Sequence, residues 1–168
     1  FLKSQGKNIG RSLVEEDKLD LARELLLQPE GSRIILPSDA IAATGADAAE
    51  SAHTTPSERI PENEMGLDIG PLTVAAYAEI LRAARTIVWN GPMGVFEKEA
   101  FAAGTIAVAR AVAESGAVSI VGGGDSAAAV EKAGVADRIT HISTGGGASL
   151  EFLAGRVLPG VAALSDKR

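Results

Sequence analysis

Three segments in the second half of the chain repeat one pattern, in which an apolar run is followed by a polar or glycine-rich turn and then by a stretch with helical spacing. The apolar runs are TIVWN at 86–90, VSIV at 118–121 and ITHIS at 139–143. Short apolar strands that alternate with helices are typical of parallel sheets covered on both faces. The pattern therefore predicts an α/β fold with a doubly wound, Rossmann-like parallel sheet and helices on both of its faces.

The rest of the chain carries weaker signals. Ser12 and Glu15 have capping-box spacing and predict the start of a helix over 13–28. RIILP at 33–37 predicts a buried strand. The remaining expectations are an irregular excursion over 38–64 with a short strand near 51–54, a functional turn at 65–71, and helices over 73–84, 97–114, 126–133 and 149–153.

Composition excludes several classes of function. The net charge is −6, so a surface for nucleic acid or for an anionic membrane is not expected. The chain has no cysteine, which excludes disulfides and fits a reducing cytoplasm. The two histidines, His53 and His141, are far apart in sequence, so a zinc site is not expected. No apolar run is long enough to span a membrane.

Two glycine-rich turns are the strongest functional signal. In open parallel sheets, ligands bind beyond the carboxyl ends of the strands, where these turns are expected. IVGGGDS at 120–126 and STGGGAS at 143–149 both lead from a strand into a helix. Successive glycine N–H groups can form a concavity for an anion, and the helix that follows adds its positive end. Each turn alone could be merely tight, but two side by side would suit a polyphosphate or a phosphoryl group during transfer.

The first turn can also be interpreted as a dinucleotide fingerprint. GGGDSA at 122–127 satisfies G-x-G-x-x-A, but the fingerprint expects an acidic residue about 20 positions later, and the next strand ends at 141–143 without one. Asp125 stands where the pyrophosphate would lie, and a carboxylate so close to phosphate is favourable if a magnesium ion bridges the two groups. We therefore favour a magnesium nucleotide over NAD.

Other polar residues near the strand ends are ambiguous. Glu97 could accept hydrogen bonds from ribose hydroxyls or be a solvated acid at a helix start, and Asn90 could donate to a phosphate oxygen. Trp89 is expected in the core, Asp68 as a turn or packing acid, and His141 as a structural strand residue.

The quoted motifs together resemble one known family. FLKSQGKNIG, MGLDIGP, WNGPMGVFE, GGGDSAAAV and STGGGASLEFLAG…LPGVAAL, in this order, are similar to the C-terminal part of the phosphoglycerate kinase family. The resemblance implies a glycolytic kinase that moves a phosphoryl group reversibly between 1,3-bisphosphoglycerate and Mg-ADP, giving 3-phosphoglycerate and ATP. It implies that residues 1–168 are the C-terminal nucleotide-binding lobe of a two-lobe, monomeric enzyme, with the first half of this lobe and the N-terminal substrate lobe absent.

The resemblance also assigns residues to roles around Mg-ATP or Mg-ADP. The adenine pocket would include Gly66, Leu67 and Pro92, with Glu97 as the ribose-binding acid. The phosphate side would comprise Asn90, Gly123, Gly124, Asp125 and Ser126, with Asp125 as the Mg²⁺ ligand, and Thr144 and Gly145 in the facing wall. The catalytic N–H groups, which meet the oxygens of the transferring phosphoryl group, would be those of Gly124 and Gly147.

One departure limits what this chain is expected to do alone. The family's phosphate-neutralising lysines, its catalytic arginine and its basic substrate patch would lie before residue 1, so we expect no turnover from these residues by themselves. Two alternatives stay open: a non-catalytic interaction or antigen module and, less favoured, an NAD-binding domain. The first would bind no nucleotide, and the second would bind NAD without magnesium.

Overall fold

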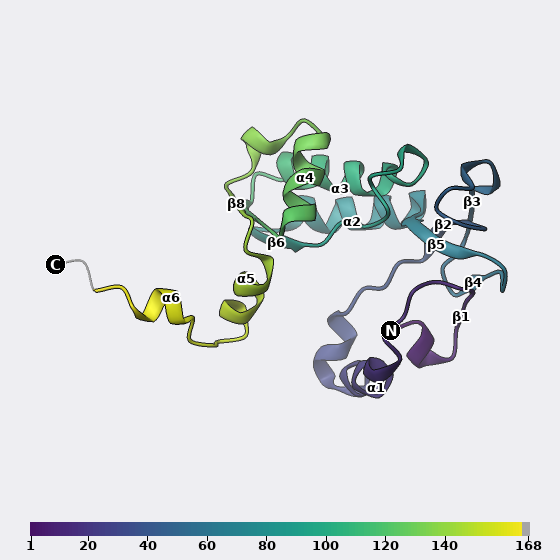
Figure 1. Ribbon diagram of the computed structural model, residues 1–168, viewed down its shortest axis with the longest axis horizontal. Helices are drawn as coiled ribbons and strands as arrows, with labels where there is room; N and C mark the ends of the chain where they lie inside the picture. The colour runs from purple at the N-terminus through teal and green to yellow at the C-terminus, as the bar shows by residue number, and fades with distance from the viewer. Residues whose placement is uncertain (166–168) are drawn as a thin grey trace. The chain divides into compact units, whose positions relative to one another are not determined.

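The structure is a computed structural model that describes residues 1–165 (Figure 1). The described chain divides into two compact units, which are Phe1–Ile80 with Met93–Val108, and Leu81–Pro92 with the residues from Ala109 onward. Within residues 1–165, no helix has both the length and the apolar character that crossing a bilayer requires.

The first unit is built on an antiparallel sheet. β2 (Asp39–Ala43) lies between β3 (His53–Pro56) and β5 (Met65–Ile69), and both neighbours run antiparallel to it. A second small sheet pairs β1 (Asn8–Ile9) with β4 (Arg59–Ile60) in parallel. The short strand expected near 51–54 is confirmed by β3, whereas the antiparallel sheet was not predicted.

Three predictions for this unit are wrong. The segment 38–64 is not an irregular excursion with one short strand, because it contains β2, the central strand of the antiparallel sheet, as well as β3 and β4. The strand expected at 33–37 is absent: a 3-10 helix covers Pro29–Arg33, and β2 begins only at Asp39. Pro37 has no N–H to give to a ladder, so the paired strand starts beyond it. The segment 65–71 was expected to be a turn after a strand, but it forms β5 and the start of α2. The prediction failed because Gly66 and Gly70 are residues typical of loops.

The helices of this unit begin later or earlier than the sequence suggests. α1 (Leu19–Leu27) follows a short 3-10 helix, and Ser12 does not cap it because the Ser12 hydroxyl donates to the Ile9 carbonyl oxygen at 2.6 Å. α2 (Pro71–Ala83) starts beside Asp39, whose carboxylate accepts from the N–H groups of Leu72 and Thr73 at 3.0 and 2.8 Å. α3 (Ala103–Glu114) also begins in this unit, after a 3-10 turn at 99–101. Both α2 and α3 run on into the second unit.

The second unit contains the predicted parallel sheet. β6 (Thr86–Asn90), β7 (Val118–Gly122) and β8 (His141–Ser143) pair in parallel in that order. α4 (Gly124–Lys132) follows β7, α5 (Gly146–Leu153) follows β8, and a short α6 (Pro159–Ala162) comes near the end of the described chain. The predicted α/β class with a Rossmann-like parallel sheet is confirmed.

The core of this unit explains the pattern of its strands. Ile87 and Trp89 of β6 are both 6% exposed, whereas Val88 between them is 43% exposed. Val121 of β7 and Val130 of α4 are fully buried. Because the carboxyl ends of the three strands lie at one edge, the turns that follow β6, β7 and β8 meet there.

Candidate functional site

A pocket of about 420 Å³ lies in the first unit. Its wall includes N-terminal residues, β5 and the loop Met93–Val95, together with Leu36, Pro37, Ala40, Ser57 and Ile60. Two residues of the predicted adenine pocket, Gly66 and Leu67, are part of this wall. The sequence reasoning gave no binding role to the other residues of the wall, among them Ser12, Leu13, Met93 and Val95.

Hydrogen bonds join the N-terminal segment to the entrance of β5. The Gly66 N–H donates to the Ser12 hydroxyl oxygen at 2.9 Å, and the Arg11 N–H donates to the Glu64 carbonyl oxygen at 2.7 Å. Gly10 allows this approach, because it has a φ of +56° and a Cβ there would lie 2.3 Å from two carbonyl oxygens. The N-terminal segment and the entrance of β5 are therefore held together by one backbone hydrogen bond and one from the Gly66 N–H to the Ser12 side chain.

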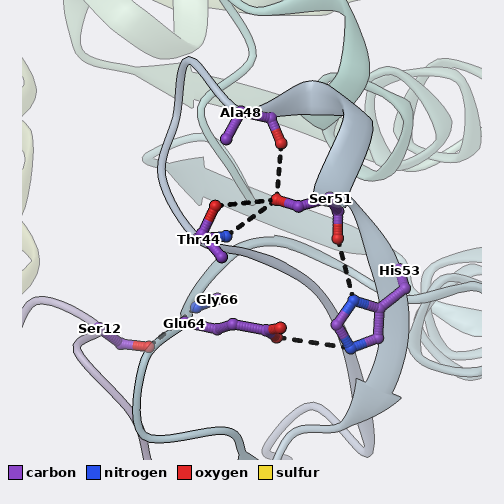
Figure 2. Close-up of polar contacts among 7 residues, drawn as sticks. All are labelled: Ser12, Thr44, Ala48, Ser51, His53, Glu64 and Gly66. Atoms are coloured by element: carbon purple, nitrogen blue, oxygen red, sulfur yellow. Dashed lines mark hydrogen bonds and ion pairs between the residues drawn. The ribbon is translucent and has the colours of Figure 1, made fainter.

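Figure 2 shows the polar contacts that hold the segment leading into Gly66. His53 Nε2 lies 3.4 Å from Glu64 Oε2, and His53 Nδ1 lies 3.1 Å from the Ser51 carbonyl oxygen. The Ser51 hydroxyl donates to the Ala48 carbonyl oxygen at 2.8 Å and accepts from the Thr44 N–H at 3.0 Å. These contacts stabilise the loop and bring no side chain of their own to the pocket wall.

Asp68 connects β5 to the start of α3. It is 5% exposed, and its carboxylate accepts from the Gly104 N–H at 2.7 Å and from the Ile69 N–H at 2.9 Å. Burial raises the pKa of Asp68 above its usual value, although the two N–H donors act in the opposite direction. The prediction that Asp68 is a packing acid is confirmed.

In the second unit, the two glycine turns lie side by side, as predicted. The Gly123 N–H donates to the Ser143 carbonyl oxygen at 2.8 Å. A Cβ on Gly146 would lie 2.8 Å from Gly123 Cα and 2.9 Å from Asn90 Oδ1. The turns after β6, β7 and β8 therefore meet at a point where no side chain fits between them.

The turn after β6 is held from two sides at Gly91. Trp89 Nε1 donates to the Gly91 carbonyl oxygen at 2.6 Å, and the Gly91 N–H donates to the Ser126 hydroxyl oxygen at 2.7 Å. Gly91 has a φ of +112°, which disfavours other residues. Ser126 is 1% exposed, so its hydroxyl faces this turn rather than solvent, and the prediction that Trp89 is a core residue is confirmed.

Both helices that follow the glycine turns start without a side-chain cap. Their N-caps are Gly123 for α4 and Gly145 for α5. Gly124 and Asp125, the first two residues of α4, are exposed. Backbone N–H groups at an uncapped helix start, together with the positive end of the helix, favour an anion.

The donor set limits which metal the turns could hold. Within residues 1–165, no group of three His, Cys, Asp or Glu side chains could form a metal cage. Asp125 is a single exposed carboxylate in the first turn of α4. One carboxylate fits Mg²⁺, which usually takes one or two protein carboxylates and completes its shell with phosphate oxygens and water.

The predicted site residues fall into both units. Those of the first unit are Gly66, Leu67 and Glu97; those of the second are Asn90, Pro92, Gly123–Ser126 and Thr144–Gly147. Glu97 is exposed, lies two residues after Val95, and is not part of the described pocket wall. Among the missed residues, Leu13 had a signal in the sequence, because it forms with Val14 an apolar pair that precedes α1.

Comparisons with known proteins point to one family. The sequence profile of the phosphoglycerate kinase family, described as "Phosphoglycerate kinase", matches residues 1–156. The phosphoglycerate kinases of Clostridium novyi and Prosthecochloris aestuarii are 58% and 59% identical over 99% of this chain. The chain spans 42% and 43% of the length of these relatives.

Solved structures agree with the sequence relatives. Phosphoglycerate kinase from Coxiella burnetii matches 96% of this chain with a TM-score of 0.88 and 46% identity, over 42% of its own chain. The enzyme from Pyrococcus horikoshii matches 96% of this chain with a TM-score of 0.82 and 39% identity, over 41% of its own chain.

Proposed function

Because this chain belongs to the phosphoglycerate kinase family, we propose that it is the nucleotide-binding portion of a glycolytic kinase. The complete enzyme would transfer a phosphoryl group reversibly between 1,3-bisphosphoglycerate and Mg-ADP. The observation that carries this proposal is the meeting of two glycine turns at Gly123 and Gly146, each at the start of an uncapped helix. Residues 1–168 would be the C-terminal lobe without its first half.

The phosphates would be bound by backbone N–H groups. Phosphoryl transfer requires little covalent chemistry from a protein, so positioning and charge stabilisation dominate. N–H groups held by a packed turn can stabilise the equatorial oxygens without reorganising. Gly124 and Gly147 would supply these donors, and the other proposed phosphate contacts are Asn90, Thr144 and Gly145. Gly123 and Ser126 would shape the phosphate site instead, because the Gly123 N–H donates to the Ser143 carbonyl oxygen and the Ser126 hydroxyl accepts from the Gly91 N–H.

Asp125 is proposed as the protein's ligand to Mg²⁺. When bound, the ion would neutralise charge on the phosphate oxygens. Asp125 is exposed beside the N–H groups of α4, so its carboxylate is available to a cation that also contacts phosphate.

The adenosine would be bound by residues of the first unit, and the role of Pro92 in the adenine pocket stays a prediction. The apolar pocket at Gly66 and Leu67 suits a purine ring. Glu97 would accept hydrogen bonds from the ribose hydroxyls.

The location in the cytoplasm and the monomeric state of the complete enzyme stay predictions, as does the binding of 3-phosphoglycerate by a separate lobe.

A thermal-shift series on this chain tests the proposal. Mg-ADP at about 100 times its Kd should stabilise the folded chain by about 2.7 kcal/mol. Stabilisation by NAD without magnesium would support the dinucleotide alternative, and no stabilisation by either ligand would favour a non-catalytic module.

Asp125→Ala tests the metal role. The substitution should weaken ADP binding in the presence of Mg²⁺ more than in EDTA. Asp137→Ala is the matched control, because it removes the same charge in the 3-10 turn before β8, at the opposite edge of the parallel sheet. Equal weakening with and without Mg²⁺ would contradict a metal role.

A further inference from the structure

The loop Met93–Val95 forms one wall of the pocket in the first unit, yet none of its backbone N–H groups belongs to a helix or strand. Each of the three has a specific acceptor. The N–H groups of Met93 and Gly94 donate to Thr105 Oγ1 at 3.0 and 3.2 Å. The Val95 N–H donates to the Leu67 carbonyl oxygen at 2.8 Å.

Thr105 is well placed to hold this loop. It lies in the first turn of α3, it is 0% exposed, and it is not part of the pocket wall. Its hydroxyl oxygen accepts from two consecutive backbone N–H groups, which fixes the direction of that peptide unit. Any effect of Thr105 on a ligand must therefore pass through the loop.

The position of Thr105 is itself fixed by Asp68. The buried Asp68 carboxylate accepts from the Gly104 N–H at 2.7 Å, directly before Thr105. A Cβ on Gly104 would lie 2.4 Å from Asp68 Oδ1, and a Cβ on Gly94 would lie 2.6 Å from the same atom. Both glycines thus pack on one carboxylate, so β5, the loop and the start of α3 form one rigid bracket.

We infer that Thr105 is a positioning residue for the base-binding wall: it holds the backbone of Met93 and Gly94 in place beside Leu67, so that the loop and Leu67 form one surface for a purine ring. The inference rests on the proposed function, because it takes the pocket to be the base site. Thr105 is not a catalytic residue, since it does not itself line the pocket and acts only through the backbone of Met93 and Gly94.

Thr105→Val and Thr105→Ser separate this role from simple packing. Valine keeps the volume and the β-branch but removes the acceptor, whereas serine keeps the acceptor. Leaving part-buried N–H groups without an acceptor is unfavourable, so the loop should leave its position in T105V. We expect T105V to weaken Mg-ADP binding about tenfold in calorimetric titrations of the 168-residue chain, and T105S to bind within about twofold of the unchanged chain.

Two controls make the readout specific. Magnesium pyrophosphate lacks a base, so its affinity should be the same for all the variants. Thr140→Val, in the second unit, removes a hydroxyl that accepts from the Ser119 N–H at 3.1 Å, and it should lower stability without changing the affinity for Mg-ADP. If T105V does not fold, Thr105→Ala is used in its place, because alanine also removes the hydroxyl acceptor.

The outcomes are distinguishable. Equal Mg-ADP affinity for T105V and the unchanged chain would overturn the positioning role, and so would a parallel loss of pyrophosphate affinity, which indicates general structural damage. If the unchanged chain binds no Mg-ADP, the proposed function falls, and this inference falls with it.

Discussion

Gly146→Ala is the most direct test of how the two glycine turns are packed. A Cβ at this position would lie 2.8 Å from Gly123 Cα, 3.1 Å from Gly123 N and 2.9 Å from Asn90 Oδ1. Two of these atoms belong to the backbone, so relief requires the turns to move apart. Overpacking of this kind costs about 1–3 kcal/mol, and we expect the free energy of unfolding to fall by that amount.

The adjacent Gly147→Ala is the matched control. A Cβ on Gly147 would have no atom within 4 Å, and both residues lie in the first turn of α5. Alanine is the better helix former, so G147A should leave stability unchanged or raise it by up to about 1 kcal/mol.

Urea unfolding followed by tryptophan fluorescence measures both variants. Trp89 is the only tryptophan in the chain, and it lies at the end of β6 in the same unit as the turns. G146A should lower the urea midpoint, and G147A should not. Equal midpoints for the two variants would refute the close approach of Gly123 and Gly146.

Three further predictions concern acids and activity. Burial acts to raise the pKa of Asp39, but hydrogen bonds from the Thr73 hydroxyl and from the Leu72 and Thr73 N–H groups outweigh burial and lower the pKa. Asp39 therefore stabilises the fold above its unfolded pKa, and this contribution is lost as the pH falls through the folded pKa. The stability gap between the unchanged chain and Asp39→Asn in urea titrations should accordingly shrink on acidification, and a constant gap would contradict this. Burial raises the pKa of Asp68, so its contribution to stability is present at low pH and is lost as the pH rises through the folded pKa. The free energy of unfolding of the unchanged chain should therefore increase relative to that of Asp68→Asn as the pH falls. The 168-residue chain should show no phosphoglycerate kinase turnover in a coupled assay. A rate well above the blank would refute the expectation that turnover requires lysine and arginine side chains from outside these residues.

The second unit could be predicted from its sequence because its signals are local. Each apolar run of four or five residues is long enough for one strand, and each glycine turn marks the step from strand to helix. The starts of the two helices were misplaced by two or three residues for one reason: α4 begins at Gly124 and α5 at Gly146, inside the glycine runs. A helix tolerates glycine in its first turn, where backbone N–H groups are unpaired in any case.

The first unit could not be predicted in the same way because tertiary contacts decide it. Ser12 has the spacing of a helix cap, but its hydroxyl is used by Ile9 and Gly66 instead. MGLDIG looks like a loop, yet antiparallel pairing with β2 makes it a strand. Asp39 and Thr73 are 34 positions apart and share a buried hydrogen bond that starts α2. No local pattern encodes these partners.

The same distinction applies to the candidate site and explains what sequence motifs detect. The glycine turns are visible in the sequence, and at Gly146 the need for a residue without a Cβ is clear, because a Cβ there would lie 2.8 Å from Gly123 Cα. Thr105 has no such signature, since a threonine in a helix is compatible with many roles, and only the two N–H groups that reach its hydroxyl distinguish it. A glycine that packs two backbone segments together is thus visible in the sequence, whereas the side chains that position a backbone segment become visible only when the chain has folded. Variants at the second kind of position are therefore the stronger test of a proposed site, because a resemblance between motifs does not predict their effect.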